Sequence, residues 1–162
     1  MSASCRIRPA RRADLPTLFA LLRQMADYER LLHRFTATET ALAAALFTPC
    51  PLAHAVLAER GDVAVGLAIW TYSFQTFRCD RVLFVEDVFV IESERGNGTG
   101  YALFRHLAGE ALEQGCERME WRVLDWNEPA LRFYDRLGAK PPPAGWVRRE
   151  LSADALHALA GR

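Results

Sequence analysis

Residues 95–100 of the chain read Arg95-Gly96-Asn97-Gly98-Thr99-Gly100. This stretch lies between a β-forming apolar run, Val82 to Ile91, and a segment with helical apolar spacing, Tyr101 to Gln114, which predicts a strand, a glycine loop and a helix. Glycine lets the backbone turn tightly and approach a ligand, because it has no Cβ atom. The N–H groups that open a helix favour a pyrophosphate, and Arg95 adds a fixed positive charge. We therefore expect an anionic cofactor at this loop.

Two common phosphate-binding loops do not fit the position of this one. A Rossmann loop follows the first strand of its unit and is followed by an acid about 20 residues on. Here the loop lies past the middle of the chain, after several probable antiparallel strands. A P-loop would end in Gly-Lys-Ser/Thr, which this loop lacks. A plain helix start with spare glycines remains as the structural alternative.

The composition indicates that residues 1–162 form a single globular domain. The chain has 162 residues, of which 51% are hydrophobic and 25% charged, and these are ordinary values for a folded α/β domain. Its 20 Lys and Arg balance its 20 Asp and Glu, unlike the one-sided basic surface of a nucleic-acid binder. No segment approaches the roughly 20 apolar residues of a membrane span. We expect neither nucleic acid nor a membrane as a partner.

The cysteines indicate an intracellular protein without a metal site. Cys5, Cys50, Cys79 and Cys116 are widely scattered, and the histidines show no ligand spacing. Reduced thiols in a cytoplasmic protein are the simplest reading of this pattern. The N-terminus is rich in arginine but lacks the apolar core of a signal peptide.

Periodicity predicts alternating strands and helices. Strands are expected at residues 5–9, 54–59, 63–72, 82–91, 118–124 and 146–151. Helices are expected from Asp14 to about Glu29, from Thr38 to Phe47, from Tyr101 to Gln114, from Asn127 to Gly138, and from Ser152. This order predicts a mixed α/β fold, with helices on the faces of a sheet.

Glu86 and Asp87 interrupt an otherwise apolar strand. Because successive side chains on a strand face opposite sides, at least one carboxylate should face a buried side of the sheet. Burial costs free energy unless the group is paired, and it raises the pKa of a carboxylate toward that of a general base. A structural ion pair with one of the arginines is the alternative.

Tyr134 lies on the apolar stripe of its predicted helix and is most simply a core tyrosine. A phenol can also protonate a thiolate leaving group, a role that matters only if the cofactor is a thioester. The Asn127-Glu128-Pro129 segment is a good helix start on its own physical merits.

Several of these motifs, taken together, resemble the GNAT superfamily of N-acetyltransferases. The resemblance rests on Arg95-x-x-Gly98-x-Gly100 after a strand and on Asn127-Glu128-Pro129 before Phe133-Tyr134-x-x-Leu137-Gly138-Ala139. Four further segments resemble the diamine (spermidine/spermine) acetyltransferase branch: Ile7 to Ala10, Ala26 to Glu29, Val85 to Val90, and Gly145-Trp146. The resemblance covers almost the whole chain. It implies a central, mostly antiparallel mixed sheet of six or seven strands flanked by helices.

The resemblance also implies a site for acetyl-CoA and a homodimer. The cofactor-binding residues would be Val88, Phe89, Val90, Arg95, Gly96, Asn97, Gly98, Thr99, Gly100, Tyr101, Asn127, Pro129 and Ala130. Tyr134 would be the general acid, and Glu86, through water, would accept the proton of the acceptor amine. Tyr28, Glu29, Glu86, Asp87 and Arg78 would contact the acceptor.

The acceptor expected from the sequence is a small primary amine, such as an amino acid or short amine. Arg30, Arg34 and Arg78 stand near positions where the polyamine branch carries acids, and like charges repel a polycation. An arginine there could instead bind the carboxylate of an amino acid. A polyamine acetyltransferase, a non-catalytic acetyl-CoA sensor and acetylation of protein amines remain as alternatives.

Overall fold

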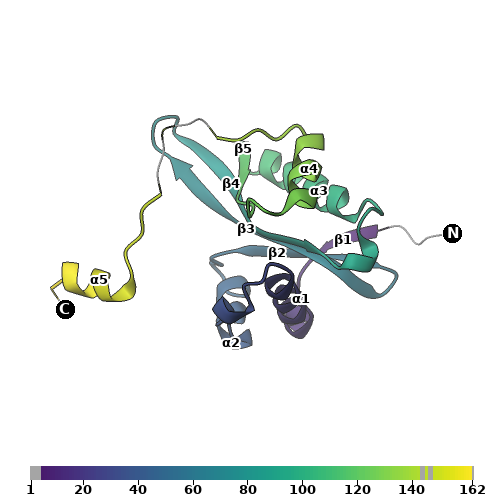
Figure 1. Cartoon of the computed structure of the whole chain (residues 1–162), viewed down its shortest axis with the longest axis horizontal. Helices are drawn as coiled ribbons and strands as arrows, with labels where there is room; N and C mark the ends of the chain where they lie inside the picture. The colour runs from purple at the N-terminus through teal and green to yellow at the C-terminus, as the bar shows by residue number, and fades with distance from the viewer. Residues whose placement is uncertain (1–4, 143–144, 146–147, 162) are drawn as a thin grey trace. The chain divides into compact units, whose positions relative to one another are not determined.

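The computed structural model describes residues 5–142, 145 and 148–161. The chain forms two compact units, Met1–Leu124 and Asp125–Arg162 (Figure 1). The strands of the first unit are β1 (Cys5–Pro9), β2 (His54–Arg60), β3 (Val63–Gln75), β4 (Asp80–Val90) and β5 (Cys116–Trp121). Its helices are α1 (Leu15–Tyr28), α2 (Glu39–Leu46) and α3 (Thr99–Glu113), with short 3-10 turns at Arg12–Asp14, Leu32–Arg34 and Glu92–Glu94.

The sheet has the strand order β1-β2-β3-β4-β5. The first four strands are antiparallel neighbours, and β5 joins β4 in parallel. The predicted mixed, mostly antiparallel sheet is confirmed, but it contains five strands instead of six or seven. Of the sixth expected strand, residues 146 and 147 lie outside the described residues, and residues 148–151 form no strand.

Helices cover both faces of this sheet (Figure 1). On one face, Leu18 of α1 and Leu46 of α2 pack with sheet residues that include Leu57 and Leu67. On the other face, α3 packs through Leu103 and Leu107. Strand side chains alternate between the two faces of the sheet. A sheet residue that packs with α1 and α2 therefore points to one face, and one that packs with α3 points to the other.

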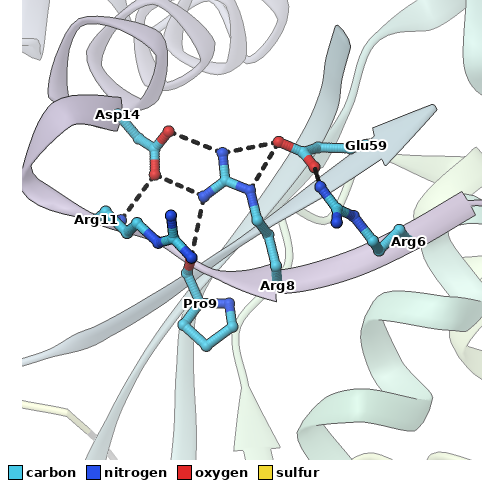
Figure 2. Close-up of polar contacts among 6 residues, drawn as sticks. All are labelled: Arg6, Arg8, Pro9, Arg11, Asp14 and Glu59. Carbon is cyan, nitrogen blue, oxygen red and sulfur yellow. Dashed lines mark hydrogen bonds and ion pairs between the residues drawn. The ribbon is translucent and has the colours of Figure 1, made fainter. Parts of the chain in front are cut away.

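A polar network holds the start of α1 against the sheet (Figure 2). Arg8 of β1 donates two hydrogen bonds to the Asp14 carboxylate, at 2.6 and 2.8 Å, and one of 2.7 Å to Glu59 of β2. Arg6 reaches the second oxygen of Glu59 at 2.7 Å. The sequence predicts that the Asp14 side chain caps α1, but the structure shows no such hydrogen bond. The Asp14 carboxylate binds Arg8 and the Arg11 N–H instead.

The second unit contains α4 (Glu128–Arg136) and α5 (Ala153–Leu159). Both begin where the sequence predicts, because Asn127 and Ser152 accept hydrogen bonds from backbone N–H groups of the first turn. Within the described residues of the chain, no helix is both long and apolar enough to cross a membrane. All four cysteines, which lie in described segments, are free thiols.

Candidate active site

The site is organised by a β-bulge in β4. Trp70 of β3 pairs with Val85, whereas the preceding residue Ile69 pairs with Asp87, so Glu86 is an extra residue on β4. A bulge of this kind shifts the alternation of side chains along the strand that carries it. The alternation expected from the sequence therefore stops at Glu86.

The shift places the neighbouring carboxylates on the α1 face of the sheet. Val85 packs in the cluster under α3, while Phe89 belongs to the cluster under α1, and Asp87 lies two residues before Phe89. Glu86 accepts a 3.2 Å hydrogen bond from the Thr71 hydroxyl, and Thr71 lies two residues beyond Ile69 on that same face. The two carboxylates therefore lie close together instead of on opposite faces.

The two carboxylates differ in environment. Burial, together with the negative charges of Glu86 and Glu29, raises the pKa of Asp87 to about 6. Glu29, at the end of α1, also has a raised pKa because of burial. Glu86 is 37% exposed and lies 3.6 Å from the Arg122 guanidinium. Asp87 is the less exposed of the two carboxylates, and it is half-buried.

The pairing of β4 with β5 ends just before the bulge. The parallel ladder ends at the pair Val85–Trp121, whereas pairing of β4 with β3 continues to Val90. On the β5 side, the ladder therefore gives the described residues 86–90 of β4 no strand partner, while the Val90 carbonyl accepts a hydrogen bond from the Arg95 Nε. A ligand arm that pairs with a strand edge needs such an edge.

The glycine loop turns from β4 into α3 as the sequence predicts. Gly96 and Gly98 have φ of +78° and +81°, a region that favours glycine. Gly98 is the residue that precedes α3, so the first N–H groups of this helix open onto the loop. The positive φ angles explain why glycine occupies these two positions. The N–H groups at the start of the helix could bind an anion.

Sequence reasoning missed Arg60, which holds this loop. Its Nε atom donates to Glu94 at 2.7 Å, and one Nη atom lies 3.5 Å from the Asn97 carbonyl oxygen and 3.3 Å from the Thr99 hydroxyl. Arg60 is the last residue of β2, and no local spacing links it to the loop.

Arg95 lies over an aromatic ring of the first unit. Its guanidinium carbon is 4.2 Å from the centroid of Tyr28 at the end of α1, and its Nε donates to the Val90 carbonyl at 3.1 Å. The structure thus brings together Tyr28, a predicted acceptor residue, and Arg95, a predicted cofactor residue.

Arg78 is not brought to the bulge. It lies in the turn between β3 and β4, where it forms ion pairs with Asp80 at 3.2 Å and with Glu117. Asp80 and Asp87 are seven residues apart on one strand, which corresponds to about 20 Å. We therefore do not include Arg78 in the proposed acceptor site.

In the second unit, the predicted residues lie on α4 and its cap. The Asn127 Oδ1 atom accepts a 3.4 Å hydrogen bond from the Ala130 N–H, and Pro129 occupies the first turn. Tyr134 lies in the last turn of α4, with its ring centroid 5.5 Å from that of Phe133. The catalytic role of Tyr134 stays a prediction.

Residues 19–139 match the model of the acetyltransferase (GNAT) family. The chain belongs to this family. The thialysine N-epsilon-acetyltransferase of Mus musculus is 33% identical to this GNAT chain over 99% of both chains. The L-ornithine N5-acetyltransferase of Arabidopsis thaliana is 30% identical over 95% of this chain and 87% of its own length. An integron cassette protein of V. cholerae has a TM-score of 0.78 and 26% identity, covering 98% of this chain and 99% of its own.

The predicted family, fold and enzyme class are thereby confirmed: this GNAT chain is an N-acetyltransferase. Acetyl-CoA is the co-substrate of this family. Among the residues that the structure describes, no group of three or more His, Cys, Asp or Glu side chains is placed to hold a metal ion.

Proposed function

We propose that this GNAT protein transfers an acetyl group from acetyl-CoA to the side-chain amine of a small basic amino acid. The observation that carries this proposal is the β4 bulge, which gathers Glu86 and Asp87 on the α1 face, near Glu29. Three acids attract an ammonium group. Two relatives named for thialysine and L-ornithine support an amino acid as the acceptor.

The residues present fit acetyl-CoA, which supplies the acetyl thioester. The backbone of Val88, Phe89 and Val90 lies on the strand edge that β5 leaves, so an extended pantetheine arm would pair there. The N–H groups of the loop from Gly96 to Tyr101 would hold the pyrophosphate. Asn127, Pro129 and Ala130 would line the arm, by resemblance to the family.

We assign acceptance of the proton from the acceptor ammonium to Asp87, at the β4 bulge. An alkyl ammonium has a pKa near 10 and must lose a proton before its nitrogen can attack. A carboxylate with a pKa of about 6 is ionised at neutral pH yet more basic than an ordinary one, so Asp87 suits proton acceptance. Glu86, exposed and beside Arg122, would bind the ammonium. This assignment moves the base from Glu86, the residue expected from the sequence, to its neighbour.

The remaining steps follow the family resemblance. As the new N–C bond forms and the C–S bond breaks, a backbone N–H of β4 would donate to the carbonyl oxygen. Tyr134 would give its phenol proton to the departing sulfur. These roles require no metal ion.

Arg30 is the residue we assign to the carboxylate of the acceptor. It directly follows Glu29 and has a φ of +59°, a conformation that costs free energy for any residue with a Cβ atom. The same conformation closes α1 at its C-terminal end, where Arg30 is the neighbour of Glu29. A guanidinium binds a carboxylate through paired hydrogen bonds, and it repels a polyamine, which carries only positive charges.

A panel of acceptors tests the proposal. The protein is incubated with acetyl-CoA and, separately, thialysine, lysine, ornithine, putrescine, spermidine and spermine, and the released thiol is measured. We expect the basic amino acids to exceed the polyamines in kcat/KM by about tenfold or more, because one misplaced charge is enough for such discrimination. A polyamine as the best acceptor would show that the acceptor assignment is wrong. If the protein binds acetyl-CoA but releases no CoA thiol with any of these amines, a non-catalytic acetyl-CoA sensor is favoured.

The homodimer and the cytoplasmic location stay predictions. The dimer rests on the resemblance to the family, and the location rests on the scattered thiols. Light scattering of the purified protein tests the dimer.

A further inference from the structure

The contact between Arg95 and Tyr28 joins the two halves of the proposed site. Arg95 begins the glycine loop, whereas Tyr28 is the last residue of α1. The 4.2 Å separation of guanidinium carbon and ring centroid is well within the range of a cation–π contact. No sequence motif predicts this pairing.

Arg95 is anchored on its other side by β4. Its Nε donates to the Val90 carbonyl at 3.1 Å, and its guanidinium carbon is 5.8 Å from the centroid of Phe89. The guanidinium therefore lies between the end of α1 and the last residues of β4. A planar group with donors at its edge and a face for stacking suits such a position better than an ammonium.

The end of α1 has a fixed backbone but an exposed edge. The Leu31 and Arg30 N–H groups donate to the Ala26 and Asp27 carbonyls, at 2.8 and 2.9 Å, which closes the helix in a Schellman motif. Tyr28 is nevertheless 36% exposed. Rotation of its side chain is limited by the stacked Arg95.

We propose that Arg95 is a positioning residue for the acceptor: it holds Tyr28, and with it the end of α1 that carries Glu29, beside the β4 bulge. This inference rests on the proposed function. The guanidinium acts on the acceptor side because it lies against Tyr28 and Phe89, whereas the loop N–H groups after Gly96 would hold the pyrophosphate. Its loss weakens amine binding more than acetyl-CoA binding.

Four variants and one matched control test this role. Tyr28→Leu removes the ring, Tyr28→Phe keeps it, Arg95→Gln removes the cation, and Arg95→Lys keeps charge without the planar group. Arg23→Gln, at an exposed arginine of α1, is the control. For each variant, the KM of the amine is measured together with the Kd of CoA by calorimetry.

Tyr28→Leu and Arg95→Gln should each raise the KM of the amine by about fivefold, the effect expected for one stacked cation. The Kd of CoA should change by less than about twofold, and Tyr28→Phe should restore the amine KM toward the wild-type value. Because the two residues act through one contact, a double variant that combines Tyr28→Leu with Arg95→Gln should have an amine KM no higher than that of the more severe single variant. Arg95→Lys should lie between wild type and Arg95→Gln.

Two results would overturn the inference. If Arg95→Gln weakens CoA binding and leaves the amine KM unchanged, the guanidinium acts on the phosphates. If the effects of the two substitutions add, the contact has no role in positioning. Failure of the proposed function has a different signature, because the wild type would then release no thiol with any amine, and the positioning role would fall with it.

Discussion

The Arg60 guanidinium lies 2.7 Å from the Glu94 carboxylate, which ties the end of β2 to the segment that enters the glycine loop. The side chains are only 16% and 20% exposed, so water screens this ion pair less than a surface pair. Further contacts of Arg60 with Asn97 and Thr99 reach the loop itself. The loop is thus held in shape before any ligand arrives, which reduces the entropy lost on binding.

Removal of this ion pair should weaken acetyl-CoA binding. We expect Arg60→Gln and Glu94→Gln each to raise the Kd of CoA by about three- to tenfold, because the loop must then be ordered on binding. Calorimetry measures the Kd, and Arg105→Gln, at an exposed position of α3, is the matched control. An unchanged Kd in both variants would mean that the loop is rigid without Arg60.

The activity should fall in acid with the protonation of Asp87. Because its pKa is raised to about 6, Asp87 loses its ability to accept a proton as the pH drops below that value. We expect kcat to decline below about pH 6, which gives the pH–rate profile an acidic limb. Asp87→Asn should lower kcat by about 100-fold or more and abolish this acidic limb.

Glu86→Gln provides the contrast for Asp87. It should keep the acidic limb but shift it to lower pH, because the charge of Glu86 helps to raise the pKa of Asp87. The measurement is kcat at saturating amine across the pH range. Loss of the limb in Glu86→Gln, with its survival in Asp87→Asn, would return the role of base to Glu86.

Gly66→Ala should separate β3 from β4 at the proposed cofactor edge. An added Cβ atom would lie 2.6 Å from the Phe89 carbonyl oxygen, so the backbone must move. We expect a loss of about 1–3 kcal/mol in the free energy of unfolding, the usual cost of overpacking. Urea denaturation measures it. Gly109→Ala, with nothing within 4 Å of its added Cβ, should instead be neutral or stabilising.

Arg30→Gly should separate stability from acceptor binding. Arg30 and Gly138 occupy the same position in the closing motifs of α1 and α4, with φ of +59° and +81°. Glycine relieves the strain at residue 30, so we expect a gain of roughly 0.5–1 kcal/mol in the free energy of unfolding. The KM of an amino-acid acceptor should rise, since the guanidinium is lost. Gly138→Ala should destabilise, which makes it the reciprocal control.

The network around Arg8 should set part of the acid stability. Hydrogen bonds from Arg8 lower the pKa of Asp14 from 3.8 to about 2, and that of Glu59 is lowered by Arg8 and Arg6. A carboxyl with a depressed folded pKa stabilises the fold above its unfolded pKa. This stabilisation is lost as the pH falls toward the folded pKa, here between about pH 4 and pH 2.

For Asp14 the stabilisation amounts to about 2 kcal/mol. Asp14→Asn should therefore lower the free energy of unfolding at neutral pH and flatten its decline between about pH 4 and pH 2. Denaturant titrations at several pH values measure this. An equally steep decline in the variant would show that other carboxyls dominate.

Local patterns were sufficient for most of the fold. The spacing of apolar residues located β1 to β5, and the caps Thr38, Asn127 and Ser152 were predicted where the structure has them. Such signals act within one helical turn or one strand, so a sequence displays them directly. Alternation failed at Glu86, because a bulge depends on how β4 pairs with β3 and not on β4 alone.

The family, the glycine loop after a strand and the two adjacent acids in that strand are recognisable from the residues alone. The fold was needed to show that Asp87 is the more buried acid, that Arg60 holds the loop, and that Arg95 stacks on Tyr28. These contacts join residues that lie far apart along the chain. Arg60 and Glu94 are 34 residues apart, and such contacts depend on strand pairing and helix packing, which no local pattern encodes. The Arg95–Gly100 loop was recognisable from its residues, but its partners were not.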